Sequence, residues 1–314
     1  MRFSLRLNND LAVERYVRIA VLAEETGFDQ VWVSHDLFWR SAPVLVTAAA
    51  QATSRIALGV GVFNPVSMHA AEIAMAAATL NEVSRGRALL GIGAGADRFL
   101  GWAGMSFEAP VPRTRRAILE VRALLSGHAP AGWDAEGHLR AGPASVPVYV
   151  GAMGRKMLEL GGEMADGVLP LLFPPEHFAS ATARIEAGAN RAGRDPSTID
   201  VAACVWCSID ADPRRARRAL AEKIAYFGAS FSADLLEQAS LKASDFPTGM
   251  SADQVTPRML GLGIAGGPDE IAERCAVLAA AGASHISFGP PLGPDPERAV
   301  GELGRYVLPR LSSI

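Results

Sequence analysis

Short apolar runs typical of β-strands alternate with amphipathic runs typical of α-helices along almost the whole chain. The helical runs place apolar residues three and four positions apart and stop at a glycine, as in 12–27, 69–86 and 268–282. Eight strand-like runs begin at Arg2, Gln30, Ile56, Ala88, Val146, Gly167, Ile199 and His285. Eight β/α units in 314 residues favour a single α/β domain, a (β/α)₈ TIM barrel, over a doubly wound open sheet.

One stretch tests that choice, because Gly91, Gly93 and Ala96 have the G-x-G-x-x-[GA] spacing of a dinucleotide-binding turn. Such a turn needs a helix that opens directly after it. The residues that follow, 97–113, include two more glycines and two prolines and predict a long loop instead. We therefore interpret these glycines as the end of the fourth strand of a barrel.

Glycines close three of the predicted strands, in GVGV at 59–62, GIGAG at 91–95 and VGAMG at 150–154. The carboxyl ends of barrel strands form the face on which barrel enzymes build their active sites. Missing side chains there let a flat ligand approach the backbone, although close packing of strands is an alternative reason for glycine. We expect one elongated, mostly apolar cleft on this face.

Composition and charge narrow the classes of partner. The 33 acidic residues slightly outnumber the 30 basic ones, and no basic run is interleaved with aromatic residues, so we expect no nucleic-acid partner. Asp10 and Glu14 interrupt the apolar core that a signal peptide would need, and no apolar stretch reaches the length of a membrane span. The sequence predicts a cytoplasmic enzyme with a small-molecule substrate and no membrane contact.

Cys204 and Cys207 have the C-x-x-C spacing of some redox and zinc sites. They lie in a strand-like run, where residues three apart point to opposite faces of the sheet. One metal ion could not reach both sulfurs, so we expect no metal site and thiols that are part of the core.

Three segments carry a resemblance to a known superfamily: VWVSHDLFW at 31–39, the long run from 57 to 97, and VPVYVGAMGRKMLELGGEMADGVL at 146–169. They resemble the luciferase-like monooxygenase superfamily, and within it the coenzyme F420-dependent methylenetetrahydromethanopterin reductases. The resemblance implies a TIM barrel with a helical insertion after strand seven, here about 213–265, and a homodimer. It also implies an oxidoreductase that transfers a hydride between the deazaflavin coenzyme F420 and a small organic substrate.

In such relatives the ring of the cofactor lies across the strand ends, against a bulge in strand three that holds a non-proline cis peptide bond. The matching bond here joins Gly61 and Val62. The other positions that the resemblance assigns to cofactor binding are Asn64, Gly93, Ala94, Gly95, Gly151, Ala152, Met153 and Gly154. Met153 stands where relatives often have glutamine, and the helix after Gly154 suits an anionic group of the cofactor at its amino end.

Three residues are candidates for catalysis: His35, Asp36 and Asp97. Relatives commonly have Asp-His at the end of strand two, whereas this chain has the reverse order, so we keep both residues as candidates. Asp97 stands where the reductases also carry an aspartate. The strand-one carboxylate of pterin-reducing relatives is absent here, and Arg6 occupies that strand.

Several alternatives remain open at this stage. The barrel could bind FMN and act as a monooxygenase, use a nicotinamide directly as a reductase, or bind a flavin-like ligand without turnover. His69 could touch a ligand, but a lone histidine more often belongs to loop packing. Phe227, Phe231, Phe246 and Met250 of the predicted insertion could line a pocket or belong to the core.

Overall fold

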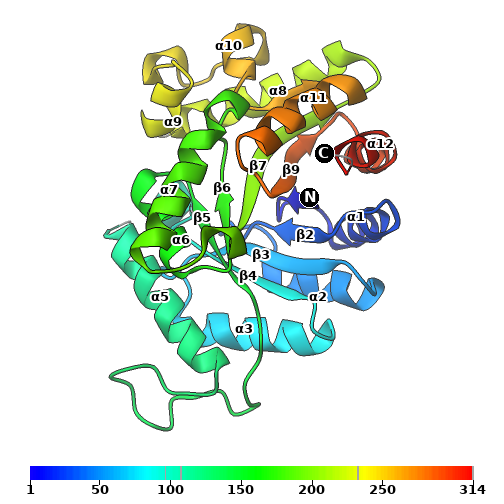
Figure 1. Cartoon of the computed structure of the whole chain (residues 1–314). Coiled ribbons are helices and arrows are strands. Elements are labelled where there is room, and N and C mark those ends of the chain that lie inside the picture. Colours follow the sequence, from blue (N-terminus) through cyan, green and yellow to red (C-terminus); the bar gives the residue numbers. More distant parts are fainter. Residues whose placement is uncertain (96, 107, 232, 313–314) are drawn as a thin grey trace.

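The computed structural model describes residues 1–95, 97–106, 108–231 and 233–312, and the side chains of Asp97, Ser230 and Asp234 are also outside the described part. Parallel strands form a closed barrel with helices around it (Figure 1). The barrel strands are β1 (Arg2–Leu7), β2 (Gln30–Val33), β3 (Ala57–Phe63), β4 (Ala88–Ile92), β5 (Val148–Ala152), β6 (Gly167–Pro170), β7 (Asp200–Ile209) and β9 (His285–Leu292). All eight predicted strands are confirmed.

The ring closes because β9 lies between β7 and β1, while each strand from β1 to β7 pairs with the next. A short additional strand, β8 (Ile264–Gly266), pairs with the end of β7 and was not predicted. A closed ring of parallel strands excludes the doubly wound alternative, whose strand order reverses at the cofactor site.

Helices cover the outside of the barrel. Their bounds are α1 (Val13–Glu25), α2 (Ala42–Ala52), α3 (Ala70–Val83), α4 (Asp97–Trp102), α5 (Pro110–Leu125), α6 (Arg155–Met164), α7 (Phe178–Arg191), α11 (Pro268–Ala280), α12 (Pro296–Glu302) and α13 (Leu308–Leu311). The prediction of a continuous loop over 97–113 was wrong, because α4 occupies its first part and buries Leu100, and α5 begins at Pro110. Among the described residues, no helix is long and apolar enough to cross a membrane.

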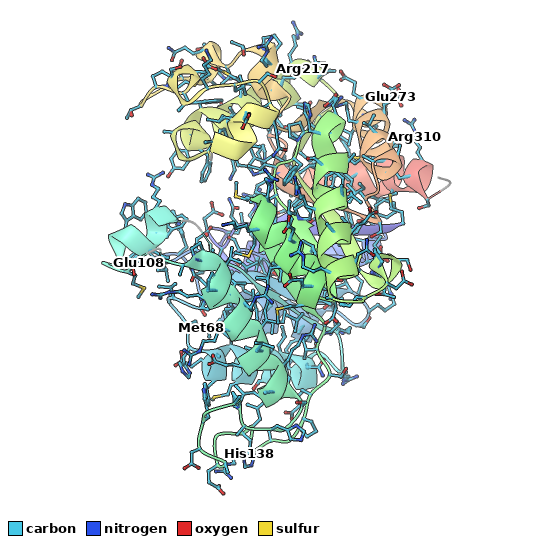
Figure 2. All side chains as sticks on the ribbon, turned by 60° about the vertical axis from the view of Figure 1, so that its left-hand side comes forward. Met68, Glu108, His138, Arg217, Glu273 and Arg310 are labelled. Atoms are coloured by element: carbon cyan, nitrogen blue, oxygen red, sulfur yellow. The ribbon has the colours of Figure 1, made fainter. Side chains whose placement is uncertain are left out.

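Between β7 and α11 the chain forms three further helices, α8 (Pro213–Phe227), α9 (Ala233–Gln238) and α10 (Pro257–Leu260). They gather at one end of the molecule, at the top of Figure 1. Arg217 of α8 and His138 of the long α5–β5 connection lie at opposite ends (Figure 2). Trp206 at the end of β7 packs with buried residues of α8 and α9, so this segment has its own small core beside the barrel mouth.

Inside the barrel, a large side chain on one strand lies beside a glycine on the next. The indole of Trp32 on β2 occupies the place where Gly59 of β3 would carry a Cβ. The ring of Tyr149 on β5 does the same at Gly167 of β6. Close packing of strands, the alternative reason for glycine, therefore explains these two positions.

The C-x-x-C cysteines lie on opposite sides of the barrel wall. Cys204 packs inside with Trp32, whereas Cys207 belongs to the core between strands and helices. Both thiols are buried and free, and burial raises their pKa above the usual range of cysteine. The prediction that the two sulfurs face away from each other is confirmed.

A polar network closes the amino end of the barrel, opposite the predicted site. Asp200 accepts hydrogen bonds from the Tyr149 hydroxyl at 2.8 Å and the Ser284 hydroxyl at 3.2 Å, and its Oδ2 lies 3.1 Å from His285 Nδ1. Arg2 forms an ion pair with the same carboxylate at 3.1 Å. Burial acts to raise the pKa of Asp200, but these hydrogen bonds and the charge of Arg2 hold it well below its usual value.

Candidate active site

The carboxyl end of β3 is irregular, as predicted. Its pairing with β4 shifts register between Val60 and Phe63, and the peptide bond between Gly61 and Val62 is cis. A non-proline cis bond is uncommon in proteins, so its presence at the predicted position is a specific match.

Val62 lies against the glycines of the two following strands. A Cβ on Gly151 of β5 would lie 2.7 Å from Val62 Cγ1, and one on Gly93 would lie 3.0 Å from Val62 Cγ2. A Cβ on Gly91 would be 3.2 Å from Val62 Cγ1. We expected these glycines to leave room for a ligand directly. The structure differs, because the side chain of Val62 takes that room and forms an apolar wall across β3, β4 and β5.

Asn64 ties the loop after β3 to the loop after β4. Its amide Nδ2 donates a hydrogen bond to the carbonyl of Ala94, and its Oδ1 accepts one from the backbone N–H of Val66 at 2.8 Å. Gly95 has a φ of +64°, a conformation that favours glycine, and a Cβ there would lie 2.9 Å from Asn64 Nδ2. The polar atoms of Asn64 thus position both loops, and its contact with a cofactor stays a prediction.

The turn after β5 leads directly into α6. Ala152 is buried, Met153 packs against the small core of the α8–α10 segment, and Gly154 precedes the first helical residue. Arg155 and Lys156 follow in the first turn and are exposed. Free backbone N–H groups and two cations at this helix end favour an anionic ligand.

His35 and Asp36, at the end of β2, face different surroundings. The His35 ring packs edge-on against Phe63 at 5.2 Å between ring centroids, and burial lowers the pKa of its imidazole. Within the described part of the chain, His35 Nδ1 is buried and has no hydrogen-bond partner. Asp36 instead lies near the charges of Lys223 and Arg6. Burial is the largest effect on Asp36 and raises its pKa above the usual range of aspartate.

A lysine from α8 reaches this part of the barrel mouth. The Lys223 ammonium lies 4.4 Å from the ring centre of Phe227 and 5.5 Å from that of Trp206. Burial lowers the pKa of Lys223 to about 8, while Asp10 and Asp36 act in the opposite direction. Arg6, on β1, is close enough to influence the pKa of both Lys223 and Asp36. Residues far apart in sequence therefore form one charged group at the mouth.

Comparison with known proteins decides the family. Residues 2–285 match the model of the luciferase-like monooxygenase family. The chain belongs to this family. The 5,10-methylenetetrahydromethanopterin reductase of Methanolobus tindarius is 34% identical over 98% of this chain and 100% of its own length. The enzyme of the same name from Archaeoglobus fulgidus is 33% identical over 99% of this chain and 100% of its length.

Solved structures of luciferase-like proteins agree with this assignment. The coenzyme F420-dependent tetrahydromethanopterin reductase of Methanopyrus kandleri superposes with a TM-score of 0.90 at 29% identity, and 98% of each chain is covered. An F420-dependent secondary alcohol dehydrogenase, solved with an F420-acetone adduct, has a TM-score of 0.81 at 22% identity, covering 99% of this chain and 98% of its own. At that identity the second likeness shows the shared fold alone.

Two other candidate residues of this luciferase-like barrel lie where helices begin, His69 before α3 and Asp97 at the start of α4. The side chain of Asp97 lies outside the described residues, so its role stays a prediction. His69 caps α3, where its Nδ1 accepts a hydrogen bond from the Ala71 N–H at 3.3 Å, and its ring stacks on Trp133 at 5.2 Å. These contacts favour the loop-packing interpretation of His69.

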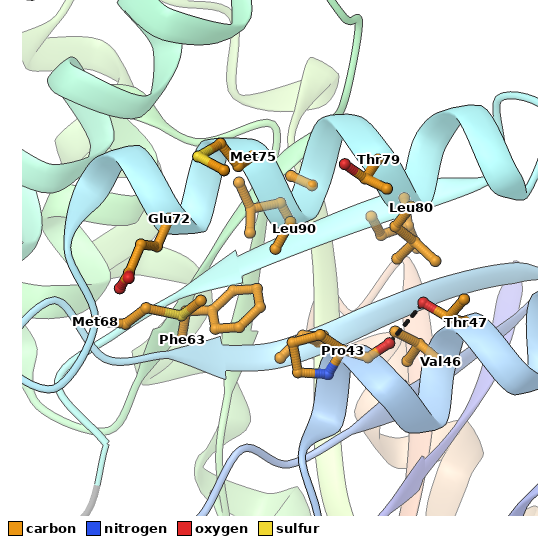
Figure 3. Close-up of a pocket in the computed structure, with 14 residues that line it drawn as sticks. Pro43, Val46, Thr47, Phe63, Met68, Glu72, Met75, Thr79, Leu80 and Leu90 are labelled. Atoms are coloured by element: carbon orange, nitrogen blue, oxygen red, sulfur yellow. Dashed lines mark hydrogen bonds between the residues drawn. The ribbon is translucent and has the colours of Figure 1, made fainter. Parts of the chain in front are cut away.

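Two cavities lie between helices on the outside of the luciferase-like barrel. One of about 430 Å³ opens between α2 and α3, and its lining includes Pro43, Val46, Phe63, Met75, Leu80 and Leu90 (Figure 3). The other, of about 600 Å³, lies between α3 and α5 beside the stacked rings of His69 and Trp133. The elongated cleft predicted at the strand ends stays a prediction.

Sequence reasoning missed Lys223 and assigned no role to Arg6. A signal for Lys223 was present, because it follows Leu220 by three positions and precedes Phe227 by four. That spacing puts a cation on the apolar face of α8. No comparable signal marks Arg6, since its surroundings come from strands that are distant in the sequence.

Proposed function

We propose that this protein is a coenzyme F420-dependent oxidoreductase that exchanges a hydride with a small organic substrate. The observation that carries the proposal is the Val62 wall, held after a cis peptide bond against Gly91, Gly93 and Gly151. It matches what the family resemblance implies for the back of the cofactor ring. The full-length likeness to the methylenetetrahydromethanopterin reductases supports the same cofactor.

The residues at the strand ends fit such a cofactor. Val62 and Ala152 offer apolar surface for a flat ring, and the glycines beneath Val62 keep that side chain close to the backbone. The amino end of α6, with Arg155 and Lys156, suits an anionic side chain of the cofactor. When bound, the deazaflavin supplies the hydride-carrying atom, and the protein supplies orientation and a pocket of low polarity.

Asp36 is the residue we assign to proton transfer. Its raised pKa keeps a proton on the carboxyl group at a higher pH than an ordinary aspartate would. In the direction in which the substrate is reduced, the Asp36 carboxyl group can donate that proton to the substrate, and the hydride comes from the bound cofactor. His35 lies beside it and offers a buried, unpaired ring nitrogen in the described structure.

Cofactor binding tests the proposal directly. Purified protein is titrated with F420 and, separately, with FMN, while quenching of each cofactor's fluorescence is followed. We expect micromolar binding of F420. Micromolar binding of FMN with no binding of F420 would instead support the flavin-dependent monooxygenase alternative.

The Val62→Ala variant is expected to bind F420 about tenfold more weakly, because it removes two methyl groups from the wall, each worth about 0.8 kcal/mol when buried. The matched control is Val277→Ala on α11, where the side chain is 40% exposed. Equal F420 affinity of Val62→Ala and the wild type would contradict the position of the ring against this wall.

We also propose that the protein is a homodimer that uses α2 and α3. Val44 and Met75 are 61% and 57% exposed on these helices, beside the apolar cavity of Figure 3. Large exposed apolar side chains around an apolar hollow are typical of a protein interface. A second copy is the partner we infer, because the family resemblance implies one.

The mass of the particle in solution tests this. Light scattering after size exclusion is expected to give twice the mass of one chain. The combined Val44→Glu and Met75→Glu variant is expected to give a single chain. Leu119→Glu on α5, 57% exposed in the monomer, is the control that leaves the mass unchanged. A wild-type mass of one chain would end the proposal.

A further inference from the structure

Arg6 is a partly buried cation that forms no ion pair with any described residue. It lies on β1 inside the barrel mouth, where its guanidinium occupies the space left by Gly289 of β9. Its Nη2 is buried and, within the described structure, has no hydrogen-bond partner. Arg2, on the same strand, differs from Arg6 because it forms an ion pair with Asp200 at 3.1 Å. Because arginine stays charged, a buried guanidinium without an anion is costly.

Lys223 brings a second cation to the same mouth from α8. Aromatic rings of Trp206 and Phe227 hold its ammonium, as cation–π contacts do. No ion pair of Lys223 or Arg6 with a carboxylate occurs among the described residues. The two cations are close enough that the charge of Arg6 lowers the pKa of Lys223.

The nearby carboxylates do not offset both cations. Asp10 is exposed to solvent, and burial favours the protonated form of Asp36. Counted over the described residues, the mouth therefore has an excess of positive charge next to the group that we assign to proton transfer. The amino end of α6 cannot supply this arrangement, because β5 and β1 are separated by three strands in the ring.

We propose that Arg6 and Lys223 bind an oxyanion, a carboxylate or phosphate group, of the substrate. The inference rests on the proposed function, since it names the substrate class of the same site. Arginine forms paired hydrogen bonds with such groups, and lysine adds a flexible point charge. An anionic group held there would place the neighbouring carbon atoms of a small substrate beside Asp36.

Binding of two anion probes tests the inference without turnover. Inorganic phosphate and succinate are titrated into the protein, with and without F420, by calorimetry. Arg6→Gln and Lys223→Gln are each expected to weaken the better probe by about tenfold or more, and Arg6→Lys is expected to restore part of the loss. Arg55→Gln, at an exposed cation before the amino end of β3, is the matched control and should leave probe affinity unchanged. Lys156→Gln reports any probe bound instead at the amino end of α6.

The outcomes separate this inference from the proposed function. Probe binding that depends on Arg6 and Lys223 supports the inference even if F420 does not bind. Normal F420 binding without probe binding, or with probe binding that only Lys156→Gln weakens, overturns the inference and leaves the proposed function standing. Circular dichroism melting shows whether Arg6→Gln folds. Lys223→Gln, in α8 and outside the ring of strands, provides the test if it does not.

Substrate pairs give the kinetic form of the same test. For a hydroxy acid and the corresponding alcohol without its carboxylate, the wild type should have the lower KM with the acid. In Lys223→Gln the two KM values should approach each other while kcat changes less. If Arg6→Gln and Lys223→Gln both keep the lower KM with the acid, these cations do not bind the carboxylate.

Discussion

Replacing Asp36 with asparagine is expected to lower turnover by about 100- to 10,000-fold, the usual effect of losing a positioned acid or base. Asparagine keeps the shape of the side chain but holds no exchangeable acidic proton. Because the substitution keeps the size and shape of the side chain, F420 affinity should change little. Single-turnover reduction of substrate by reduced F420, followed by cofactor absorbance, measures the effect.

The pH dependence of the wild type gives an independent check. Burial raises the pKa of Asp36, so the proton is retained above the usual value of about 3.9 and is lost as pH rises through the raised value. Activity in the direction of substrate reduction should therefore fall on the alkaline side, and Asp36→Asn should lose this limb. Asp10→Asn, at the exposed neighbour, is the control. If Asp36→Asn keeps more than half of the activity, Asp36 is not the proton donor.

Removing the Asp200 carboxylate is expected to destabilise the fold by about 3–5 kcal/mol, the usual cost of breaking a buried ionic group by deleting one partner. In Asp200→Ala the Tyr149 hydroxyl and the His285 ring lose their shared acceptor inside the barrel. Urea unfolding at pH 7, followed by circular dichroism, measures the free energy of unfolding. Asp253→Ala removes an exposed ion pair with Arg218 and is the control, expected to have little effect.

The sign of the pH effect follows from the lowered pKa of Asp200. Its contribution to stability is fully present above the pKa of the carboxyl group in the unfolded chain, about 3.9, and is lost as pH falls toward the lower folded value. The difference in stability between wild type and Asp200→Ala should therefore shrink as the pH is lowered below about 4. A difference that stays constant across this range would contradict an ionised Asp200 in the folded state.

The regular part of the fold could be predicted because strand-like, mostly apolar runs alternate with amphipathic helical runs along the chain. The exceptions are short. Strand β8 has three residues and α4 has six, one of them Gly101, so each is too short to repeat its pattern clearly. In the α4 region, the nearby glycines and prolines indicate a loop more strongly than the apolar pair Phe99 and Leu100 indicates a helix, although Leu100 is buried.

The candidate site could be predicted only where local sequence carries the information. The irregular end of β3 was found through a family resemblance, and the structure has the cis bond there. What the glycines do could not be predicted, because it depends on Val62 lying across two other strands. The approach of Lys223 to Arg6, 217 positions earlier in the chain, likewise depends on the closed ring of strands.

The alternation of large and small residues around the barrel interior links positions that belong to different strands. The Trp32 indole fits only while position 59 has no side chain, and the Tyr149 ring fits only while position 167 has none. Neither member of such a pair can change alone without a clash or a void. Over evolutionary time these pairs should therefore change together, so that a homologue with a smaller residue at position 32 is free to carry a side chain at position 59.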